Sequence, residues 1–411
     1  MTLDEALARL VQGGHAARIT DTESVSTFDA LGRVLAQDVV SLIDVPPQDN
    51  TSMDGYALRA ADVPTAGAVL PLSQRIAAGH VGTALLPGTA ARIFTGAQVP
   101  AGADAIVMQE QCEAAGQTDN ASAVRINAVP LVGQWIRRRG EDVHAGATVL
   151  AHGARLTPQA QGLAATVGAA TLHVVRRPRV ALFSTGDELV MPGRVAPQDL
   201  PPGAIYNSNR YMLRGLLQAA GCEVTDLGIV PDRLDATREA LRTAAKDNDL
   251  ILTSGGVSVG EEDHIRPALS AEGRVELWQV AMKPGKPLAF GAVRRHDSRE
   301  SLFIGLPGNP VSSFVTFLLA VAPVLRALQG AAAALPQPLP MRADFDWPRP
   351  DKRREFLRVR CNAQGGLDLF ANQSSGVLTS AVWADGLLDN PPLQPIVRGD
   401  MVRYLPLTAL L

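Results

Sequence analysis

The chain has 411 residues, of which 46% are hydrophobic and 19% charged, a composition typical of soluble globular proteins. One hydrophobic core is insufficient at this length, so we expect about two to four domains. The formal net charge of −3 gives no support for a nucleic-acid partner, and the first residues lack the apolar core of a signal peptide.

Three widely spaced cysteines, Cys112, Cys222 and Cys361, favour a reducing, cytoplasmic compartment over a disulfide framework or a zinc site. The longest apolar run, residues 314–325, is interrupted by Thr316 and is too short to span a bilayer. It predicts a buried helix, and no membrane partner is expected.

The first half of the chain predicts a small β-domain inserted into a helical linker domain. Residues 3–10 have an amphipathic helical pattern, and a helical pattern returns over residues 140–150 and again from Pro158. Between these helical parts, short apolar runs punctuated by Gly and Pro predict strands. The expected divisions are a linker domain of residues 1–44 and 141–177 and an inserted β-domain of residues 45–140.

The second half alternates strand and helix patterns from Arg179 onward. Such alternation predicts a central parallel sheet with helices on both faces, here over residues 178–330. An Ala- and Pro-rich linker follows, and residues 331–411 predict a small β-barrel or sandwich. The predicted fold class is therefore multidomain α/β plus β. The predicted strands of the sheet are 180–183, 223–230, 250–253 and 302–304.

Polar or glycine-rich segments follow the predicted parallel strands, at the ends where such sheets bind ligands. The glycines of segment 254–260 would let backbone N–H groups approach a phosphate, and Gly308 and Asn309 precede a helix N-terminus. Each feature alone has a plain alternative, a simple turn for a Gly-Gly loop and a helix N-cap for Asp187. The carboxylates at these ends, which suit Mg²⁺, are Asp187, Glu188, Asp232 and Asp263.

Lys283 and Lys286 are two of only four lysines in a chain that has 34 arginines. Pro284 and Pro287 stiffen the turn between them, which indicates a need for compact ammonium donors toward a small oxyanion. A solvated turn is the alternative. With the glycine-rich segment and the carboxylates, the pattern predicts metal-assisted transfer at a phosphorylated substrate.

These motifs resemble those of the molybdopterin molybdenumtransferase family, whose module also forms the C-terminal domain of gephyrin. The resemblance covers essentially the whole chain, and several long motifs occur in the family's order. The matching segments are residues 46–57, 93–97, 100–105, 138–142, 184–189, 254–258, 283–287 and 306–310.

The resemblance implies an elongated four-domain protomer and a homodimer whose active clefts use residues of both chains. It also implies insertion of molybdenum from molybdate into adenylylated molybdopterin, with Mg²⁺-dependent release of AMP. Transient contact with other cofactor-biosynthesis proteins would follow from this role.

The resemblance also assigns roles to residues that match the family's motifs. Catalytic roles fall to Asp54, Thr95, Asp142, Glu188, Asp232, Lys283 and Lys286. Substrate binding falls to Ser254, Gly255, Gly256, Ser258, Pro307, Gly308, Asn309, Arg353 and Ser375. Metal binding falls to Asp187, Glu188 and Asp263.

The run from Lys352 to Phe356 departs from the family pattern and leaves open whether Arg353 or Arg354 serves the anion. Two other functions share parts of the pattern. A molybdopterin adenylyltransferase would need only the α/β domain and would leave Asp54 and Thr95 unexplained. An interaction scaffold of the gephyrin type would need a hydrophobic peptide groove, which no segment of the sequence marks.

Overall fold

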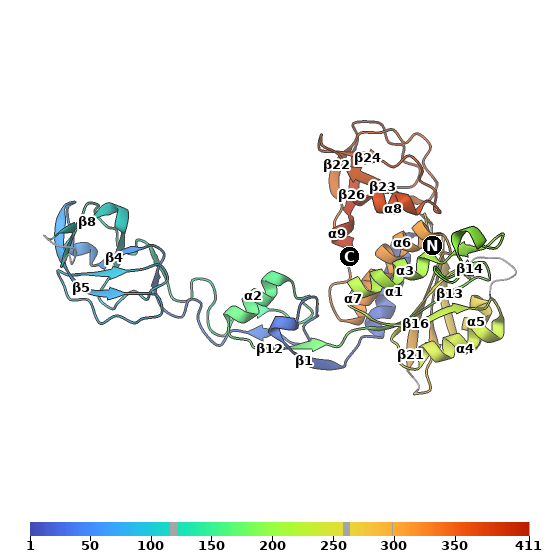
Figure 1. Cartoon of the computed structure of the whole chain (residues 1–411), viewed down its shortest axis with the longest axis horizontal. Helices are drawn as coiled ribbons and strands as arrows, with labels where there is room; N and C mark the ends of the chain where they lie inside the picture. Colours follow the sequence, from blue (N-terminus) through green and yellow to red (C-terminus); the bar gives the residue numbers. More distant parts are fainter. Residues whose placement is uncertain (116–121, 258–263, 298, 411) are drawn as a thin grey trace.

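The computed structural model describes residues 1–115, 122–257, 264–297 and 299–410. Figure 1 shows four regions: a β-domain at one end, a small linker region, the α/β domain, and a terminal barrel beside the α/β domain. The chain passes through the linker region twice, on its way out to the β-domain and on its return. Ser258 and Asp263 lie outside the described residues.

The inserted β-domain is built on one six-stranded sheet of order β7-β4-β6-β5-β9-β8. Alternate buried residues of its strands form two small apolar clusters, one around Ile93 and Ile106 and the other around Leu58 and Val107. Its strands are β4 (Gly55–Leu58), β5 (Ala68–Ile76), β6 (Ala90–Ile93), β7 (Ala105–Met108), β8 (Cys112–Ala115) and β9 (Ala123–Ile126).

In the linker region, antiparallel pairs join the outgoing chain to the returning chain: β1 with β12, β2 with β11, and β3 with β10. The predicted helix over 140–150 is wrong, because Val143 instead bridges Val45 and the segment ends in a strand. The elements are β1 (Thr22–Ser26), β2 (Val39–Val40), β3 (Asn50–Thr51), β10 (Ile136–Arg137), β11 (Thr148–Leu150), α2 (Pro158–Thr166) and β12 (Thr171–Val175).

The N-terminal helix α1 (Leu3–Ala16) has a complete capping box, in which Thr2 and Glu5 satisfy each other's backbone N–H groups. Its buried residues Leu3, Ala6 and Leu10 belong to the apolar core of the α/β domain. Helix α1 therefore packs with the α/β domain rather than with the linker domain expected over residues 1–44. In the described part of the linker region, the α-helix is α2.

The α/β domain has a six-stranded sheet of order β16-β13-β17-β21-β20-β18. The first four strands are parallel, as predicted, whereas β20 runs antiparallel to both of its neighbours, β21 and β18, and makes the sheet mixed. The strands are β13 (Arg179–Thr185), β16 (Glu223–Val230), β17 (Leu250–Ser254), β18 (Gly273–Gln279), β20 (Pro287–Arg294) and β21 (Glu300–Leu306). A short pair, β14 (Leu189–Val190) and β15 (Ile205–Tyr206), lies beside the sheet.

Both faces of this sheet are covered, because alternate residues of each strand point to opposite sides. Val180 and Leu182 of β13 join the core under α1, α3 and the α6–α7 helix, whereas Ala181 and Phe183 join the core under α4 and α5. The helices are α3 (Ser208–Ala219), α4 (Leu234–Ala245), α5 (Ile265–Glu272), α6 (Pro310–Thr316) and α7 (Ala322–Leu328).

A π-helical segment, Phe317–Val321, joins α6 to α7 into one 19-residue helix, Pro310–Leu328. The helix is longer than the predicted run of 314–325, and its length and composition would suit a membrane span. However, 89% of its most apolar window is buried inside the protein. The prediction of a buried core helix is confirmed.

The C-terminal region is a closed five-stranded barrel, since β23 pairs with β25 as well as with β24. A short strand of the lysine turn, β19 (Met282–Lys283), adds to the barrel by pairing with β23. The other elements are β22 (Leu339–Ala343), β23 (Arg354–Cys361), β24 (Gly366–Leu369), α8 (Leu378–Trp383), β25 (Gly386–Asn390), β26 (Met401–Pro406) and α9 (Leu407–Leu410). This barrel confirms the predicted fold of the region.

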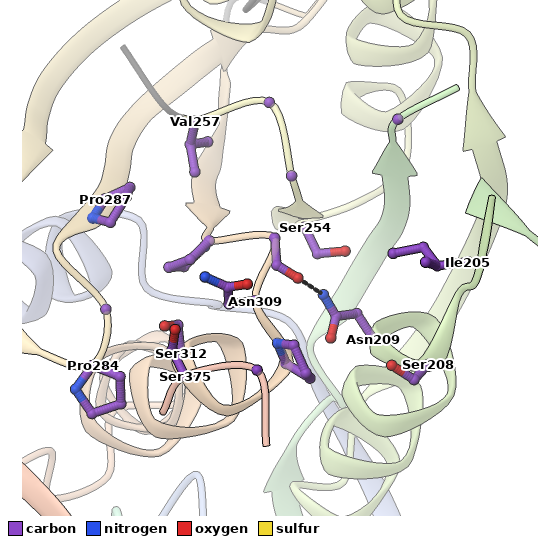
Figure 2. A pocket seen from close by; sticks show the side chains of 18 of the residues that line it. Ile205, Ser208, Asn209, Ser254, Val257, Pro284, Pro287, Asn309, Ser312 and Ser375 are labelled. Carbon is purple, nitrogen blue, oxygen red and sulfur yellow. Dashed lines mark hydrogen bonds between the residues drawn. The ribbon is translucent and has the colours of Figure 1, made fainter. Parts of the chain in front are cut away.

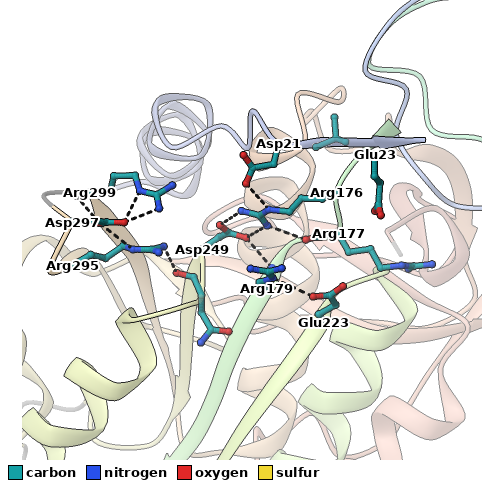
Figure 3. A network of polar contacts seen from close by, with 12 residues as sticks. Asp21, Glu23, Arg176, Arg177, Arg179, Glu223, Asp249, Arg295, Asp297 and Arg299 are labelled. Atoms are coloured by element: carbon teal, nitrogen blue, oxygen red, sulfur yellow. Dashed lines mark hydrogen bonds and ion pairs between the residues drawn. The ribbon is translucent and has the colours of Figure 1, made fainter. Parts of the chain in front are cut away.

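A polar network holds the linker region against the amino-terminal ends of the parallel strands (Figure 3). Arg176 donates to both carboxylate oxygens of Asp249 at 2.7 and 2.8 Å and to Asp21 at 2.9 Å. Because Asp249 immediately precedes β17, Arg176 ties the returning chain to the centre of the sheet. The opposite edge, where the strands end, is left open for ligands.

Candidate functional site

A cavity of about 990 Å³ lies at the carboxyl ends of the parallel strands. Its walls come from the loops after β13, β16, β17 and β21, from the lysine turn, and from residues 353 and 373–376 of the terminal region. Figure 2 shows Ser254 and Val257, Pro284 and Pro287, and Ser312 and Ser375 on different sides of this space. The predicted convergence of the strand-end loops is thus present in the structure.

The glycines after β17 form a tight backbone turn against β13. Gly255 and Gly256 have φ values of +89° and +64°, which side chains other than glycine rarely adopt. A Cβ on Gly255 would lie 2.6 Å from the carbonyl oxygen of Thr185. The hydroxyls of Ser254 and Ser184 are 3.1 Å apart below the turn. The segment therefore presents bare backbone to the cavity, which suits close approach of a phosphate.

The N-terminus of the long helix supplies a second anion-compatible wall. Asn309 is the N-cap of α6, and its side chain makes no cap hydrogen bond. Asn209 of α3 holds the preceding loop by donating to the carbonyl oxygen of Gly308 at 2.6 Å, the contact drawn in Figure 2. The amide of Val311 donates to the carbonyl oxygen of Ser375 at 3.0 Å, so the terminal region is docked at the same helix end.

Both lysines of the turn line the cavity. The Nζ atom of Lys283 lies 3.2 Å from Oε1 of Glu355 and 3.5 Å from Oδ2 of Asp351. Lys286 is exposed, and among the described residues no carboxylate lies within 4.0 Å of its Nζ atom. A bound anion would therefore contact Lys283, whose ammonium group is held by Glu355 and Asp351, and Lys286, whose ammonium group is exposed.

The structure distinguishes the two candidate arginines. Arg353 lines the cavity, where its Nε and Nη2 atoms donate to both carboxylate oxygens of Asp351. The Arg353 guanidinium lowers the pKa of Asp351 well below its usual range. Arg354 instead donates to Asp389 at 2.6 and 2.7 Å and to Asp4 at 2.8 Å. Arg353 is therefore the arginine that can meet an anion, and Arg354 joins the barrel to the N-terminus.

The predicted metal ligands are partly brought together. Glu188 and Asp232 line the cavity, and Oδ1 of Asp187 accepts a hydrogen bond from the backbone amide of Asp232 at 3.2 Å. Asp263 lies outside the described residues, and within the described ranges no group of three or more metal-binding side chains is found. Glu188 and Asp232, which line the same cavity as the glycine turn, still fit Mg²⁺, which takes one or two carboxylates plus phosphate oxygens.

Besides Asp187, three predicted residues of the described chain do not line this cavity. Asp54 and Thr95 lie at the ends of β-domain strands, and Oδ1 of Asp54 accepts from the hydroxyl and the amide of Thr95 at 2.6 and 2.8 Å. These hydrogen bonds lower the pKa of Asp54. Asp142 is exposed in the linker region. Figure 1 shows the β-domain, at β4 and β5, far from the α/β domain at β13.

The structure also adds lining residues that the sequence interpretation missed, among them Tyr206, Asn207, Asn209 and Gln373. The polar run of residues 207–209, which forms the N-cap and the first two residues of α3, is the sequence feature that points to this wall. Glu355 lies within the run from Lys352 to Phe356, and no feature of the local sequence predicts its contact with Lys283.

Family models match most of the chain. The MoeA N-terminal region (domains I and II) matches residues 1–168, a probable molybdopterin binding domain matches 181–327, and the MoeA C-terminal region (domain IV) matches 340–407. The first match spans helix α1, the inserted β-domain and most of the linker region, the second the α/β domain and the third the terminal barrel.

Similar proteins carry the same family name. The molybdopterin molybdenumtransferase of Haemophilus influenzae is 40% identical over 331 residues, which cover 80% of this chain and 78% of that protein. Molybdopterin molybdenumtransferase 2 of Mycobacterium tuberculosis is 40% identical over 386 residues, 90% of each chain.

A solved structure supports the same fold. The crystal structure of the molybdopterin biosynthesis moeA protein from Pyrococcus horikoshii OT3 superimposes with a TM-score of 0.83 at 28% identity, covering 98% of this chain and 99% of that one. The chain therefore belongs to the molybdopterin molybdenumtransferase (MoeA) family of enzymes, which act in molybdenum cofactor biosynthesis.

Proposed function

We propose that this enzyme inserts molybdenum from molybdate into adenylylated molybdopterin and releases AMP and molybdenum cofactor. The observation that carries the proposal is the convergence of two lysines, one arginine and a glycine turn on one cavity of about 990 Å³. This volume is at the upper end of the usual range for small-molecule sites, so the cavity can hold a nucleotide-linked pterin together with an oxyanion.

The cationic side of the cavity would bind molybdate. Lys283, Lys286 and Arg353 offer charge-assisted hydrogen bonds to a tetrahedral dianion, and Ser375 adds a neutral donor. Ser254, Gly255 and Gly256 would bind the phosphate region, with Pro307, Gly308 and Asn309 forming the adjacent wall at the helix N-terminus. Ser258 is assigned to the same group of substrate-binding residues.

Asp187, Glu188 and Asp263 would hold Mg²⁺, with Asp232 beside them in the cavity wall. When bound, the ion would neutralise charge on the phosphate oxygens as the bond to AMP is cleaved. The residues of the chain would orient the substrate and hold the dianion near the pterin dithiolate, so that molybdenum transfer and AMP release occur in one closed site.

The positions of Asp54, Thr95 and Asp142 support a homodimer with shared active sites. In one elongated protomer these residues do not line the cavity, so a second copy would have to present them. The proposal also includes a cytoplasmic location and transient contact with other cofactor-biosynthesis proteins.

The test is to incubate the purified protein with adenylylated molybdopterin, Mg²⁺ and molybdate, and to measure AMP and molybdenum bound to the pterin. We expect AMP release that depends on molybdate, and a loss of about tenfold or more in molybdate affinity for Lys286→Ala, because charge-assisted hydrogen bonds contribute about 1.5–3 kcal/mol. Lys246→Ala removes an exposed lysine on the end of α4 and serves as the control.

AMP release without molybdate would contradict the proposal, as would normal molybdate use by Lys286→Ala. Formation of adenylylated molybdopterin from ATP would instead favour the adenylyltransferase alternative.

A further inference from the structure

We propose that Glu355, a residue of the barrel strand β23, is a positioning residue that holds the Lys283 ammonium group in place for the anion. The inference adds one more residue to the proposed molybdate site, and the effect of Glu355 on catalysis rests on the proposed function. The contact between Glu355 and Lys283 is seen in the structure and does not depend on that function.

The Glu355 carboxylate is fully buried, with an exposed side-chain fraction of 0%. Its Oε2 atom accepts hydrogen bonds from Nε1 of Trp347 at 2.9 Å, from the amide of Asp351 at 3.0 Å and from the side chain of Asn390 at 3.4 Å. These donors come from the barrel and fix the orientation of the carboxyl group. The other oxygen, Oε1, faces Nζ of Lys283 at 3.2 Å.

The backbone strengthens this arrangement. β19 pairs in parallel with β23, and in that register Lys283 is directly opposite Glu355. The lysine therefore belongs to a turn of the α/β domain, but both its backbone and its ammonium group are held by the terminal barrel. A four-carbon side chain loses much rotamer freedom in such a contact, and the barrel provides that ordering before any ligand arrives.

Charge balance gives the pair a specific consequence. Asp351 and Glu355 together neutralise Arg353 and Lys283, whereas Lys286 has no carboxylate within 4.0 Å among the described residues. Lys286 would then supply the attraction for a dianion, and Lys283 and Arg353 would supply donors at fixed positions. The three neutral donors satisfy the buried carboxylate and hold its orientation, so that Oε1 faces Lys283.

The first test measures the contact without any substrate. Only four lysines are present in the chain, so acetylation of each by acetic anhydride can be followed by peptide mass spectrometry. We expect Glu355→Gln to increase the acetylation rate of Lys283 several-fold and to leave that of Lys246 unchanged. An unchanged rate at Lys283 would overturn the proposal.

The second test measures the reaction in the full-length enzyme. We expect Glu355→Gln to raise the KM for molybdate about tenfold, because one of the charged contacts that place the lysine is lost. Lys283→Ala combined with Glu355→Gln should be no worse than Lys283→Ala alone, because Glu355 acts through Lys283. Additive losses would overturn the proposal. A lower KM would also overturn it, since it would show that Glu355 merely reduces the positive charge.

Asp389→Asn is the matched control, because Asp389 is another fully buried carboxylate of the barrel but pairs with Arg354 and Arg403, outside the cavity. We expect it to lower the melting temperature at least as much as Glu355→Gln and to leave the KM for molybdate unchanged. If Lys283 becomes more reactive in Glu355→Gln while the KM does not change, the positioning role is overturned although the contact is real. If the unmodified enzyme releases no AMP, the proposed function fails and the acetylation result still stands.

Discussion

Arg353 and Asp351 form a two-point ion pair at the rim of the cavity, with N–O distances of 2.9 and 2.8 Å. The neighbouring Arg354 makes a similar pair with Asp389, but that pair lies in the barrel wall, where the Asp389 carboxylate is buried. Two consecutive arginines are therefore each held by an aspartate, but Arg353 faces the cavity whereas Arg354 joins the barrel to the N-terminus.

We expect Arg353→Ala to weaken molybdate use about tenfold and to lower stability less than Arg354→Ala does, because the side chain faces the cavity and is partly exposed. Arg354→Ala should instead destabilise the fold by about 3 kcal/mol, since it leaves the Asp389 carboxylate buried with one cation fewer. Urea unfolding and molybdate-dependent AMP release measure the two effects. The assignment is contradicted if Arg354→Ala affects molybdate use more than Arg353→Ala does.

The glycine turn gives a second prediction. Gly255→Ala would place a methyl group 2.6 Å from the carbonyl oxygen of Thr185 at a φ of +89°, so the turn must shift. We expect weaker binding of adenylylated molybdopterin, measured by calorimetry. The control is Gly203→Ala, which has a similar φ of +84° but no atom within 4 Å of the new Cβ. Equal losses in both variants would show that backbone strain, rather than the shape of the turn, is responsible.

A third prediction concerns acid pH. Hydrogen bonding to Arg353 lowers the pKa of Asp351 below its ordinary value of 3.8. A lowered pKa in the folded state stabilises the fold above the ordinary value, and that stabilisation is lost as the pH falls through the folded-state pKa. The difference in melting temperature between the unmodified protein and Asp351→Asn should therefore be constant near neutral pH and shrink below about pH 4. A difference that grows on acidification would contradict this assignment.

A fourth prediction tests the shared active site. Asp54→Asn and Lys283→Ala alter residues on the β-domain and in the cavity, which are far apart in one protomer (Figure 1). Mixing the two impaired variants under conditions that exchange subunits should raise AMP release above the level of either variant alone, because one site of each mixed dimer is intact. No recovery in a mixture shown to contain mixed dimers would refute sharing between subunits.

The α/β domain could be predicted from the sequence because its signals are local. Apolar strands such as β13 and β17 are followed directly by polar or glycine-rich residues, and parallel pairing then brings those ends to one edge. The two lysines were identifiable for the same reason, since their rarity and the flanking prolines appear within one short segment.

Other features depend on contacts between distant segments. Residues 140–150 have a composition that permits a helix, but their backbone pairs with residues near 40 and 45 and forms a loop and a short strand. Helix α1 is adjacent in sequence to the linker region and was predicted to belong to it, yet its apolar face packs in the core of the α/β domain. Likewise, the contact of Lys283 with Glu355 spans 72 residues and exists only after the barrel has docked.

The central claim is that the lysine turn, Arg353 and the glycine turn bind a tetrahedral dianion in one cavity. The most direct measurement is the anomalous X-ray signal of tungstate, a close analogue of molybdate, in crystals of the protein. We expect one strong peak within hydrogen-bonding distance of Lys286 and Arg353, and its loss in Lys286→Ala. A peak on an unrelated surface, or a cavity that stays empty at saturating tungstate, would contradict the account.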